Sequence, residues 1–295
     1  MANDESEIEA SRAPLLDHLV ELRSRLIICA FALAVGFLIC FAFSTNILVF
    51  LLAPFERAQS LLAVQKAAGG HHGPFDLMLA MAGLKSMAGV HVEQVHMVFT
   101  APLEVFFEKL KLSGFGAIVL TFPILAWQLY RFIAPGLYRR ERNAFLPFLI
   151  ASPVLFLMGA ALVYFVMLPF VLWFSLNQQI VGDSSISVQL LPKVSDYLSL
   201  VTTLLLGFGL CFQLPVVLAL LGMVGMVSSK FLRSGRRYAI LAVFVVAAVL
   251  TPPDPISMMS LAIPGLLLYE VSILCVWLIE RRRIRDEAAE AAAGA

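Results

Sequence analysis

Six long, nearly uncharged apolar runs divide this sequence of 295 residues. A segment inside hydrocarbon must satisfy its own backbone hydrogen bonds, which only a helix or a closed barrel achieves, and continuous runs lack the alternation of barrel strands. Hydrophobic residues make up 60% of the chain and charged residues 14%, whereas soluble domains carry about 25% charged residues. The sequence therefore predicts an all-α polytopic membrane protein with six transmembrane helices, at 26–52, 112–133, 145–176, 197–222, 238–251 and 257–279.

The basic residues alternate between the connections. Most of the 21 Lys and Arg residues lie in the N-terminal segment, the second and fourth connections and the C-terminal tail. Cytoplasmic loops carry the excess of positive charge in membrane proteins, so we predict that both termini are cytoplasmic. The expected organisation is a cytoplasmic amphipathic segment (1–25), a six-span membrane domain (26–279) with a long extracytoplasmic loop (53–110), and a basic, then Ala/Glu-rich cytoplasmic tail (280–295).

Prolines and length distinguish three of the predicted spans. The third carries Pro147, Pro153 and Pro169, so it should tilt or kink. The fifth offers only about 20 Å of apolar helix at 238–250, against about 30 Å of hydrocarbon. Pro264 interrupts the sixth. We therefore predict short fifth and sixth helices, which either thin the bilayer or are covered by a partner, unless flanking residues supply the missing length.

The long loop and the rest of the chain carry no catalytic signature. Within the stretch 66–93, the apolar residues of 75–87 recur at helical spacing and predict an amphipathic helix on the membrane or on the bundle. His71 and His72 lie within it, but no second pair of ligands accompanies them, and we expect no metal site. Phosphate-loop, HExxH and GxSxG motifs are missing from the sequence, so we expect neither enzymatic activity nor a cofactor.

Two glutamates lie at the predicted cytoplasmic edge of the membrane. Glu21 precedes Arg25 by one helical turn, and Glu141 stands among three arginines. A pair at this helical spacing stabilises a helix by a few tenths of a kcal/mol. On the residues alone, a local ion pair is therefore the favoured interpretation of both glutamates.

Other polar residues lie at or near membrane depth. Gln213 lies inside the fourth predicted span and Glu270 inside the sixth. A carboxylate at such a depth costs about 2.5–3.5 kcal/mol on insertion scales, so it usually faces protein or water. Thr251 and Asp254 lie in the short outer turn between the fifth and sixth spans, next to two prolines.

Several separated motifs together resemble one known family. They are HLVELR at 18–23, AP at 53–54, PILAWQ at 123–128, FIAPGLYRRER at 132–142, FQLPVV at 212–217, RRY at 236–238, LTPPD at 250–254 and AIPGLLLYE at 262–270. In this order they resemble TatC, the multispanning core of the twin-arginine protein translocase, over nearly the whole chain. The resemblance does not account for the stretch 66–93, and Met258 stands where the family often has glutamine.

The resemblance implies a receptor in the bacterial cytoplasmic (inner) membrane. TatC-like proteins bind the twin-arginine signal peptides of folded cargo at the cytoplasmic face. They assemble with single-span partners of the TatA/TatB type, as oligomers in the lipid bilayer, and use the proton-motive force; nucleic acid is not a partner. Carried over to this chain, the signal-peptide site would comprise Glu21, Arg23, Phe132 and Glu141. This reverses the favoured interpretation of both glutamates, because two guanidinium groups need carboxylate partners.

The resemblance also assigns a second group of residues, to partner contacts or to the cavity of the fold. These residues are Pro54, Gln213, Thr251, Asp254 and Glu270. Gln213 takes the family's buried polar position in the fourth span, where hydrogen bonding to a partner helix is a better interpretation than proton transfer. A secondary transporter with a midplane polar site is the alternative function, although the sequence contains no internal repeat. A scaffold without transport function is a third possibility.

Overall fold

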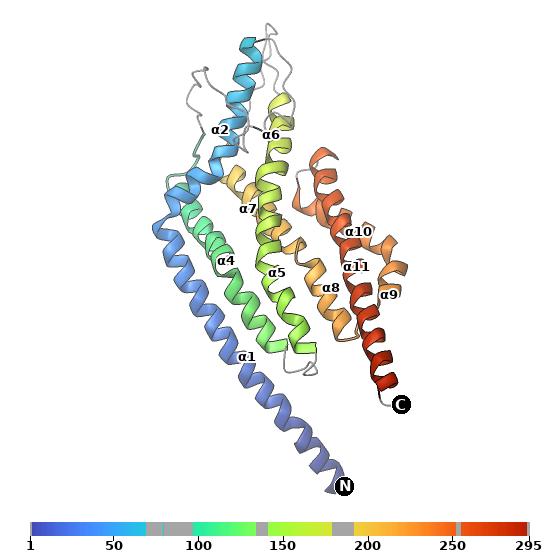
Figure 1. Ribbon diagram of the computed structural model, residues 1–295. Helices are drawn as coiled ribbons and strands as arrows, with labels where there is room; N and C mark the ends of the chain where they lie inside the picture. Colours follow the sequence, from blue (N-terminus) through green and yellow to red (C-terminus); the bar gives the residue numbers. More distant parts are fainter. Residues whose placement is uncertain are drawn as a thin grey trace.

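The computed structural model describes residues 2–68, 79, 97–133, 141–178, 192–251 and 255–293. Long helices run side by side through the molecule (Figure 1). The helix α1 begins and α11 ends at the same end of the bundle, which we call the terminal end; the opposite end is the distal end. The elements are α1 (Ala2–Ala42), α2 (Ser44–Ala68), α4 (Glu104–Ile133), α5 (Glu141–Leu162), the π-helix η2 (Val163–Met167), α6 (Leu168–Asn177), α7 (Val194–Cys211), α8 (Leu214–Met223), α9 (Ser229–Ser234), α10 (Arg236–Leu250) and α11 (Pro255–Ala293).

Five stretches of the described helices are long and apolar enough to cross a membrane. They are Leu19–Ala42, Glu104–Phe132, Ile150–Leu176, Val194–Met223 and Met258–Arg285. The fifth predicted span corresponds to α10, whose 15 residues extend about 22 Å. This length is shorter than a typical hydrocarbon core, as the sequence indicated. The membrane protein is therefore all-helical and polytopic in its described part, and the count of six spans stays a prediction.

The predicted extent of the first span was wrong. The first apolar run does not form one helix to residue 52, because α1 ends at Ala42 and α2 begins at Ser44. Backbone hydrogen bonds continue through the junction, from Phe43 N to the Ile39 carbonyl and from Ile47 N to the Phe43 carbonyl. The helix α2 then turns away from α1 and extends to the distal end (Figure 1). Pro54, expected in a loop, lies buried inside α2.

Two tyrosines explain how α2 accommodates Pro54. Proline has no amide hydrogen, so the carbonyl of Phe50, four residues earlier, loses its helical donor. The hydroxyl of Tyr164 donates to that carbonyl at 2.9 Å. The hydroxyl of Tyr197 donates to the carbonyl of Leu51 at 2.8 Å. Side chains of η2 and α7 therefore hold the middle of α2 against the bundle.

The predicted short sixth helix was also wrong. Pro264 lies inside α11, which continues from Pro255 to Ala293. One proline removes a single helical hydrogen bond, and transmembrane helices tolerate this loss when neighbouring groups compensate. The helix α11 packs against both α8 and α10. The second span likewise begins earlier than predicted, at Glu104 rather than at 112.

Prolines mark the two irregularities in the middle of the bundle. The third predicted span is one continuous helical run from α5 to α6, interrupted by η2 just before Pro169. Within it, Leu168 N donates to the Val163 carbonyl, five residues earlier, which is the π-helical pattern. The fourth span breaks between α7 and α8, two residues before Pro215. In the third span, the irregularity therefore lies next to one of its three prolines. The break in the fourth span, next to Pro215, was not predicted.

The main hydrophobic core gathers side chains from α2, α4, η2, α6, α7, α10 and α11. Glycines allow α5 and α7 to approach closely within the bundle. A Cβ atom at Gly209 would lie 2.5 Å from the ring of Phe156, and one at Gly159 would lie 2.8 Å from the Phe208 carbonyl. Phe156 in turn stacks on Phe122 of α4, with ring centroids 4.1 Å apart. Small residues at helix contacts are typical of membrane proteins, where they permit close packing.

Candidate functional site

Glu21 lies at the terminal end of the bundle, on the side of α1 that packs against α4. Arg25 Nε donates to Glu21 Oε1 at 3.1 Å, and Arg25 Nη2 donates to the same oxygen. The remaining arm of the guanidinium, Nη1, donates to Gln128 Oε1 of α4 at 3.4 Å. The side chain of Arg25 is 16% exposed and that of Glu21 is 32% exposed. The local ion pair considered from the sequence is therefore present, and Gln128 anchors it to the neighbouring helix.

The structure brings the other predicted signal-peptide residues to the same end. Arg23 is exposed and borders a shallow, mostly apolar hollow on α1. Phe132 is half-buried in the last turn of α4. Glu141 is the first residue of α5, and its side chain lies outside the described part of the structure. In Figure 1, the terminal ends of α4 and α5 lie close together, and α1 passes beside the end of α4 and continues beyond it.

Gln213 lies at the break between α7 and α8, where it joins this break to α5. Its Nε2 donates to the Ser152 carbonyl at 2.9 Å, and Ser152 Oγ donates to Gln213 Oε1 at 2.6 Å. Both ends of the amide are therefore bonded within the chain. The position is polar for a structural reason, because the break before Pro215 is tied to the neighbouring helix.

The other described residues of this group, Thr251 and Glu270, belong to different helices. Thr251 is buried at the end of α10, where its Oγ1 donates to the Ala247 carbonyl at 2.8 Å. Asp254 lies outside the described residues. The Glu270 carboxylate is half-exposed on α11 and accepts a hydrogen bond of 2.7 Å from Arg236 Nη2 of α10. Arg236 therefore neutralises the Glu270 carboxylate, which the sequence indicated at membrane depth.

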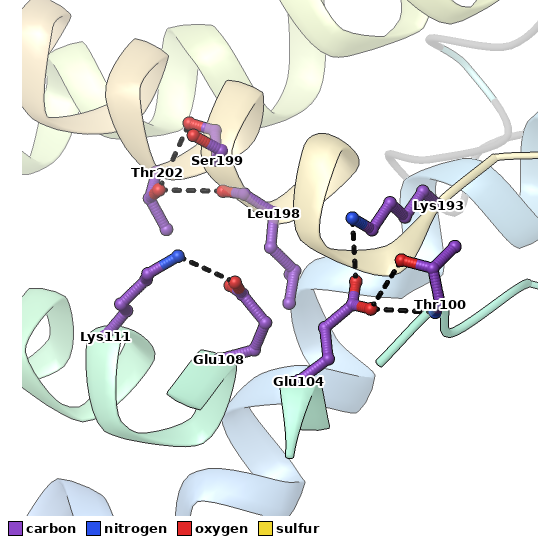
Figure 2. Close-up of polar contacts among 8 residues, drawn as sticks. All are labelled: Thr100, Glu104, Glu108, Lys111, Lys193, Leu198, Ser199 and Thr202. Carbon is purple, nitrogen blue, oxygen red and sulfur yellow. Dashed lines mark hydrogen bonds and ion pairs between the residues drawn. The ribbon is translucent and has the colours of Figure 1, made fainter. Parts of the chain in front are cut away.

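A polar cluster at the distal end lay outside the predicted sites (Figure 2). Glu104 Oε2 accepts hydrogen bonds from Thr100 N at 2.8 Å, Thr100 Oγ1 at 3.1 Å and Ala101 N at 3.1 Å. Lys193 Nζ lies 3.6 Å from Glu104 Oε1. One turn along α4, buried Glu108 pairs with Lys111 at 2.8 Å. Glu104 thus connects α4 to the segments that precede α4 and α7, whereas Glu108 pairs within α4.

A short backbone contact reinforces this distal cluster. Val98 N donates to the Pro192 carbonyl at 3.2 Å, and Val194 N donates to the Val98 carbonyl at 3.4 Å. Val98 and Lys193 form an isolated parallel bridge. The segments before α4 and α7 are therefore joined directly, with Glu104 and Lys193 on the same junction.

Comparison with known proteins decides the family. The family model described as "Sec-independent protein translocase protein (TatC)" matches residues 17–264. This chain belongs to the TatC family. A TatC of Magnetococcus marinus is 42% identical over 281 residues, covering 95% of this chain and 90% of that protein. The TatCy protein of Bacillus subtilis is 33% identical over 285 residues, covering 97% of each.

Solved TatC structures share the fold. A crystal structure of a twin-arginine translocase receptor, TatC, matches with a TM-score of 0.67 and 32% identity, covering 89% of this chain and 99% of that one. A second, in DDM, matches with a TM-score of 0.65 and covers 87% and 98%. The family resemblance drawn from the motifs is confirmed. The protein is accordingly a multi-pass component of the Sec-independent, twin-arginine translocase of the bacterial inner membrane.

Sequence reasoning about this TatC chain missed the distal carboxylates for an identifiable reason. Glu104 and Glu108 were counted as residues of a long loop, where charge is ordinary. The signal was present in the sequence Thr100-Ala101-Pro102-Leu103-Glu104, since a hydroxyl residue, a proline and a glutamate before an apolar run mark a helix N-terminus. That signal would also have moved the start of α4 to Glu104.

Proposed function

We propose that this chain is the signal-peptide receptor and core of a twin-arginine translocase. It binds the paired arginines of folded cargo proteins at its terminal end, which faces the cytoplasm. The excess of Lys and Arg in the segments assigned to that side supports the orientation. A solved relative of the same fold is a twin-arginine translocase receptor, which supports the receptor role. The protein acts as a binding and transport component without catalysing a chemical reaction of its own.

The pairing at Glu21 is the observation that carries the proposal. Both donors from Arg25 go to Oε1 of the carboxylate; among the described side chains none donates to Oε2, so this oxygen can accept from a second guanidinium. Carboxylates bind guanidinium groups through short, charge-assisted hydrogen bonds, often in bidentate geometry. Gln128 holds Arg25 in place, so the carboxylate is oriented before a peptide arrives. The second arginine of the signal pairs with Glu141 at the start of α5, with Arg23 and Phe132 at the border of the site.

Partner recruitment is the second part of the proposal. Single-span proteins of the TatA/TatB type assemble with this chain, as part of an oligomeric receptor complex that uses the proton-motive force. The short α10 supports this, because a helix of about 22 Å leaves hydrocarbon uncovered that a partner helix can match. A second group of residues contributes to the cavity of the fold and to the partner contacts. These residues are Pro54, Gln213, Thr251, Asp254 and Glu270.

The alternative of a secondary transporter has less support. Such a protein needs polar groups at midplane that are available to a substrate. The Gln213 amide is bonded at both ends by Ser152, and Glu270 is paired with Arg236. These two residues therefore do not provide a substrate site in this conformation.

Binding of a fluorescent Arg-Arg signal peptide to the chain in nanodiscs tests the receptor role. Because Glu21 is about one-third exposed, we expect Glu21→Gln to weaken binding by about 1 kcal/mol, between the values for a surface ion pair and a buried charged hydrogen bond, or about fivefold in Kd. Glu141→Gln should act similarly, and a Lys-Lys peptide should bind more weakly than the Arg-Arg peptide. Glu56→Gln is the matched control, because Glu56 is exposed on α2. Equal peptide affinity for all three variants would refute the site.

A further inference from the structure

An open hollow of about 420 Å³ lies on one side of α1, near the terminal end of the bundle. The side chains that line it are Leu19, Leu22, Arg23, Leu26, Ile27 and Ala30. Leu19, Leu26 and Ile27 are each more than half exposed, and Ala30 contributes only a methyl group. Arg23 is therefore the single charged residue of an otherwise apolar surface.

Arg23 and Glu21 leave α1 on different sides. Residues that are two positions apart in an α-helix lie about 200° apart around its axis. Arg25, two residues after Arg23, donates to Gln128 of α4, so Arg23 points away from α4. Ala30 follows Arg23 by almost two full turns, which returns it to the same side of the helix. The arginine and the apolar hollow therefore share one face of α1, and Glu21 lies on another.

The charge of Arg23 has no counter-ion among the described side chains. None of them forms an ion pair or a hydrogen bond with Arg23, whereas Arg25 pairs with Glu21. The helical neighbours of Arg23, three and four residues away, are all apolar: Leu19, Val20, Leu26 and Ile27. A charged side chain at the edge of hydrocarbon reaches toward the headgroups, and the Cα–Cβ bonds of α1 tilt toward its N-terminus, in that direction. Arg23 is thus directed at the headgroup layer with its charge uncompensated.

The spacing along α1 matches a phospholipid in one leaflet. Arg23 lies in the first turn of the apolar stretch Leu19–Ala42. Along the helix axis, Leu26 lies about 4.5 Å and Ala30 about 10.5 Å from Arg23. The hydrocarbon of one leaflet is about 15 Å deep. A phosphate bound at Arg23 therefore places the upper part of an acyl chain against Leu26, Ile27 and Ala30.

We infer that this chain binds one anionic phospholipid on α1, with the phosphate on Arg23 and the upper part of one acyl chain in the hollow. A guanidinium has five donors in a planar fork that matches the oxygens of a phosphate. One Lys or Arg near an anionic headgroup contributes about fivefold in affinity, which a zwitterionic headgroup does not gain. The inference requires only that α1 spans the membrane, so it stands whether or not the proposed receptor role is correct.

Photocrosslinking of the full chain, purified without partners in mixed micelles, tests the site. The probe is phosphatidylglycerol with a diazirine in its acyl chain, and mass spectrometry identifies the labelled residues. We expect labels on α1 at residues 26–30. Unlabelled phosphatidylglycerol should halve this labelling at about one-fifth of the concentration that phosphatidylcholine with the same acyl chains requires. Equal competition by the two lipids would overturn the inference.

Substitutions of Arg23 test the headgroup contact. Arg23→Gln should remove the fivefold preference for phosphatidylglycerol, and Arg23→Lys, which keeps the charge, should retain most of it. Arg282→Gln is the matched control, because it removes the same charge from an exposed position near the C-terminal end of α11. This control should leave the preference unchanged. The same preference in the two glutamine variants would show that Arg23 does not hold the headgroup.

Substitution of Ala30 tests the acyl-chain contact. Ala30 is exposed, so Ala30→Phe fills the hollow without disturbing the core, and it should abolish the labelling of residues 26–30. Ala42→Phe, exposed at the end of the same helix and outside the lining, should not. Glycerophosphoglycerol, the headgroup without acyl chains, should not compete with the probe. Equal effects of the two phenylalanine variants, competition by the free headgroup, or crosslinks from this face of α1 to a second copy of the chain would each refute the lipid site.

Discussion

The hydrogen bond between Tyr164 and the Phe50 carbonyl should be energetically coupled to Pro54. Proline leaves this carbonyl without its helical donor, and the Tyr164 hydroxyl takes the donor's place at 2.9 Å. Tyr164→Phe keeps the ring, which stacks on Phe50 with centroids 4.6 Å apart, and removes only the hydroxyl. In the Pro54→Ala background, residue 54 regains an amide hydrogen. The Tyr164 hydroxyl then becomes redundant.

The expected magnitude follows from burial and environment. Tyr164 is 7% exposed, and leaving a buried acceptor unsatisfied costs about 1–3 kcal/mol in water-soluble proteins. Interhelical hydrogen bonds in a membrane protein average about 0.6 kcal/mol, with a maximum of about 1.7. We therefore expect Tyr164→Phe to lower the free energy of unfolding by about 1 kcal/mol with Pro54 present and by a few tenths of a kcal/mol in Pro54→Ala. The coupling energy is the difference.

Tyr197 provides the matched control for this cycle. Its hydroxyl bonds the Leu51 carbonyl at 2.8 Å, and the helical donor of that carbonyl, the amide of Phe55, is present with or without Pro54. Tyr197→Phe should therefore cost the same in both backgrounds. Reversible unfolding of the four variants of each cycle in mixed micelles gives the coupling energies. A zero coupling for Tyr164, or an equal coupling for both tyrosines, would refute this account of the α2 proline.

Two further predictions concern packing and the distal cluster. Gly209→Ala should lower the free energy of unfolding by about 1–3 kcal/mol, because the added Cβ would lie 2.5 Å from the Phe156 ring. Gly114→Ala, with open space around it, should instead stabilise the protein by about 0.5–1 kcal/mol; thermal unfolding in detergent compares the two, and equal shifts would contradict the packing. Glu104→Gln weakens the hydrogen bonds that the side chain accepts from the Thr100 and Ala101 amides. Both amide hydrogens should therefore exchange with solvent faster, and unchanged exchange rates would count against the distal junction.

The sequence predicted the fold class and the short α10 because both follow from composition and length. Apolar runs in hydrocarbon have to be helical, so their existence needed no knowledge of packing. The boundaries failed where tertiary contacts decide them. The run 26–52 bends at Phe43, since α2 leaves α1 to pack on α4 and α6. Pro264 was predicted to interrupt the sixth helix, because proline removes one backbone hydrogen bond. The helix nevertheless continues through this position, and α11 packs against α8 and α10.

The candidate site was predictable in part for a different reason. The motif resemblance identified the family, and the i,i+4 spacing identified the Glu21–Arg25 pair. The motif at 123–128 contains Gln128, but neither signal could indicate that this residue, on another helix, accepts a hydrogen bond from Arg25. Gln213 shows the same limit. The sequence indicates a polar side chain inside a span, but only the fold identifies Ser152 as its hydrogen-bond partner.

The prolines show why a sequence alone cannot identify such partners. Three helical positions of this chain, Pro54, Pro169 and Pro215, each remove one backbone donor. The surroundings of these prolines differ: a tyrosine from another helix bonds the freed carbonyl at Pro54, a π-helical bond precedes Pro169, and a helix break tied to Ser152 precedes Pro215. The sequence shows where a backbone donor is missing, but the contacts around that position depend on which side chains the bundle brings within reach. A proline in a membrane span therefore marks where one helical hydrogen bond is missing, and the tertiary structure determines how the surrounding chain accommodates it.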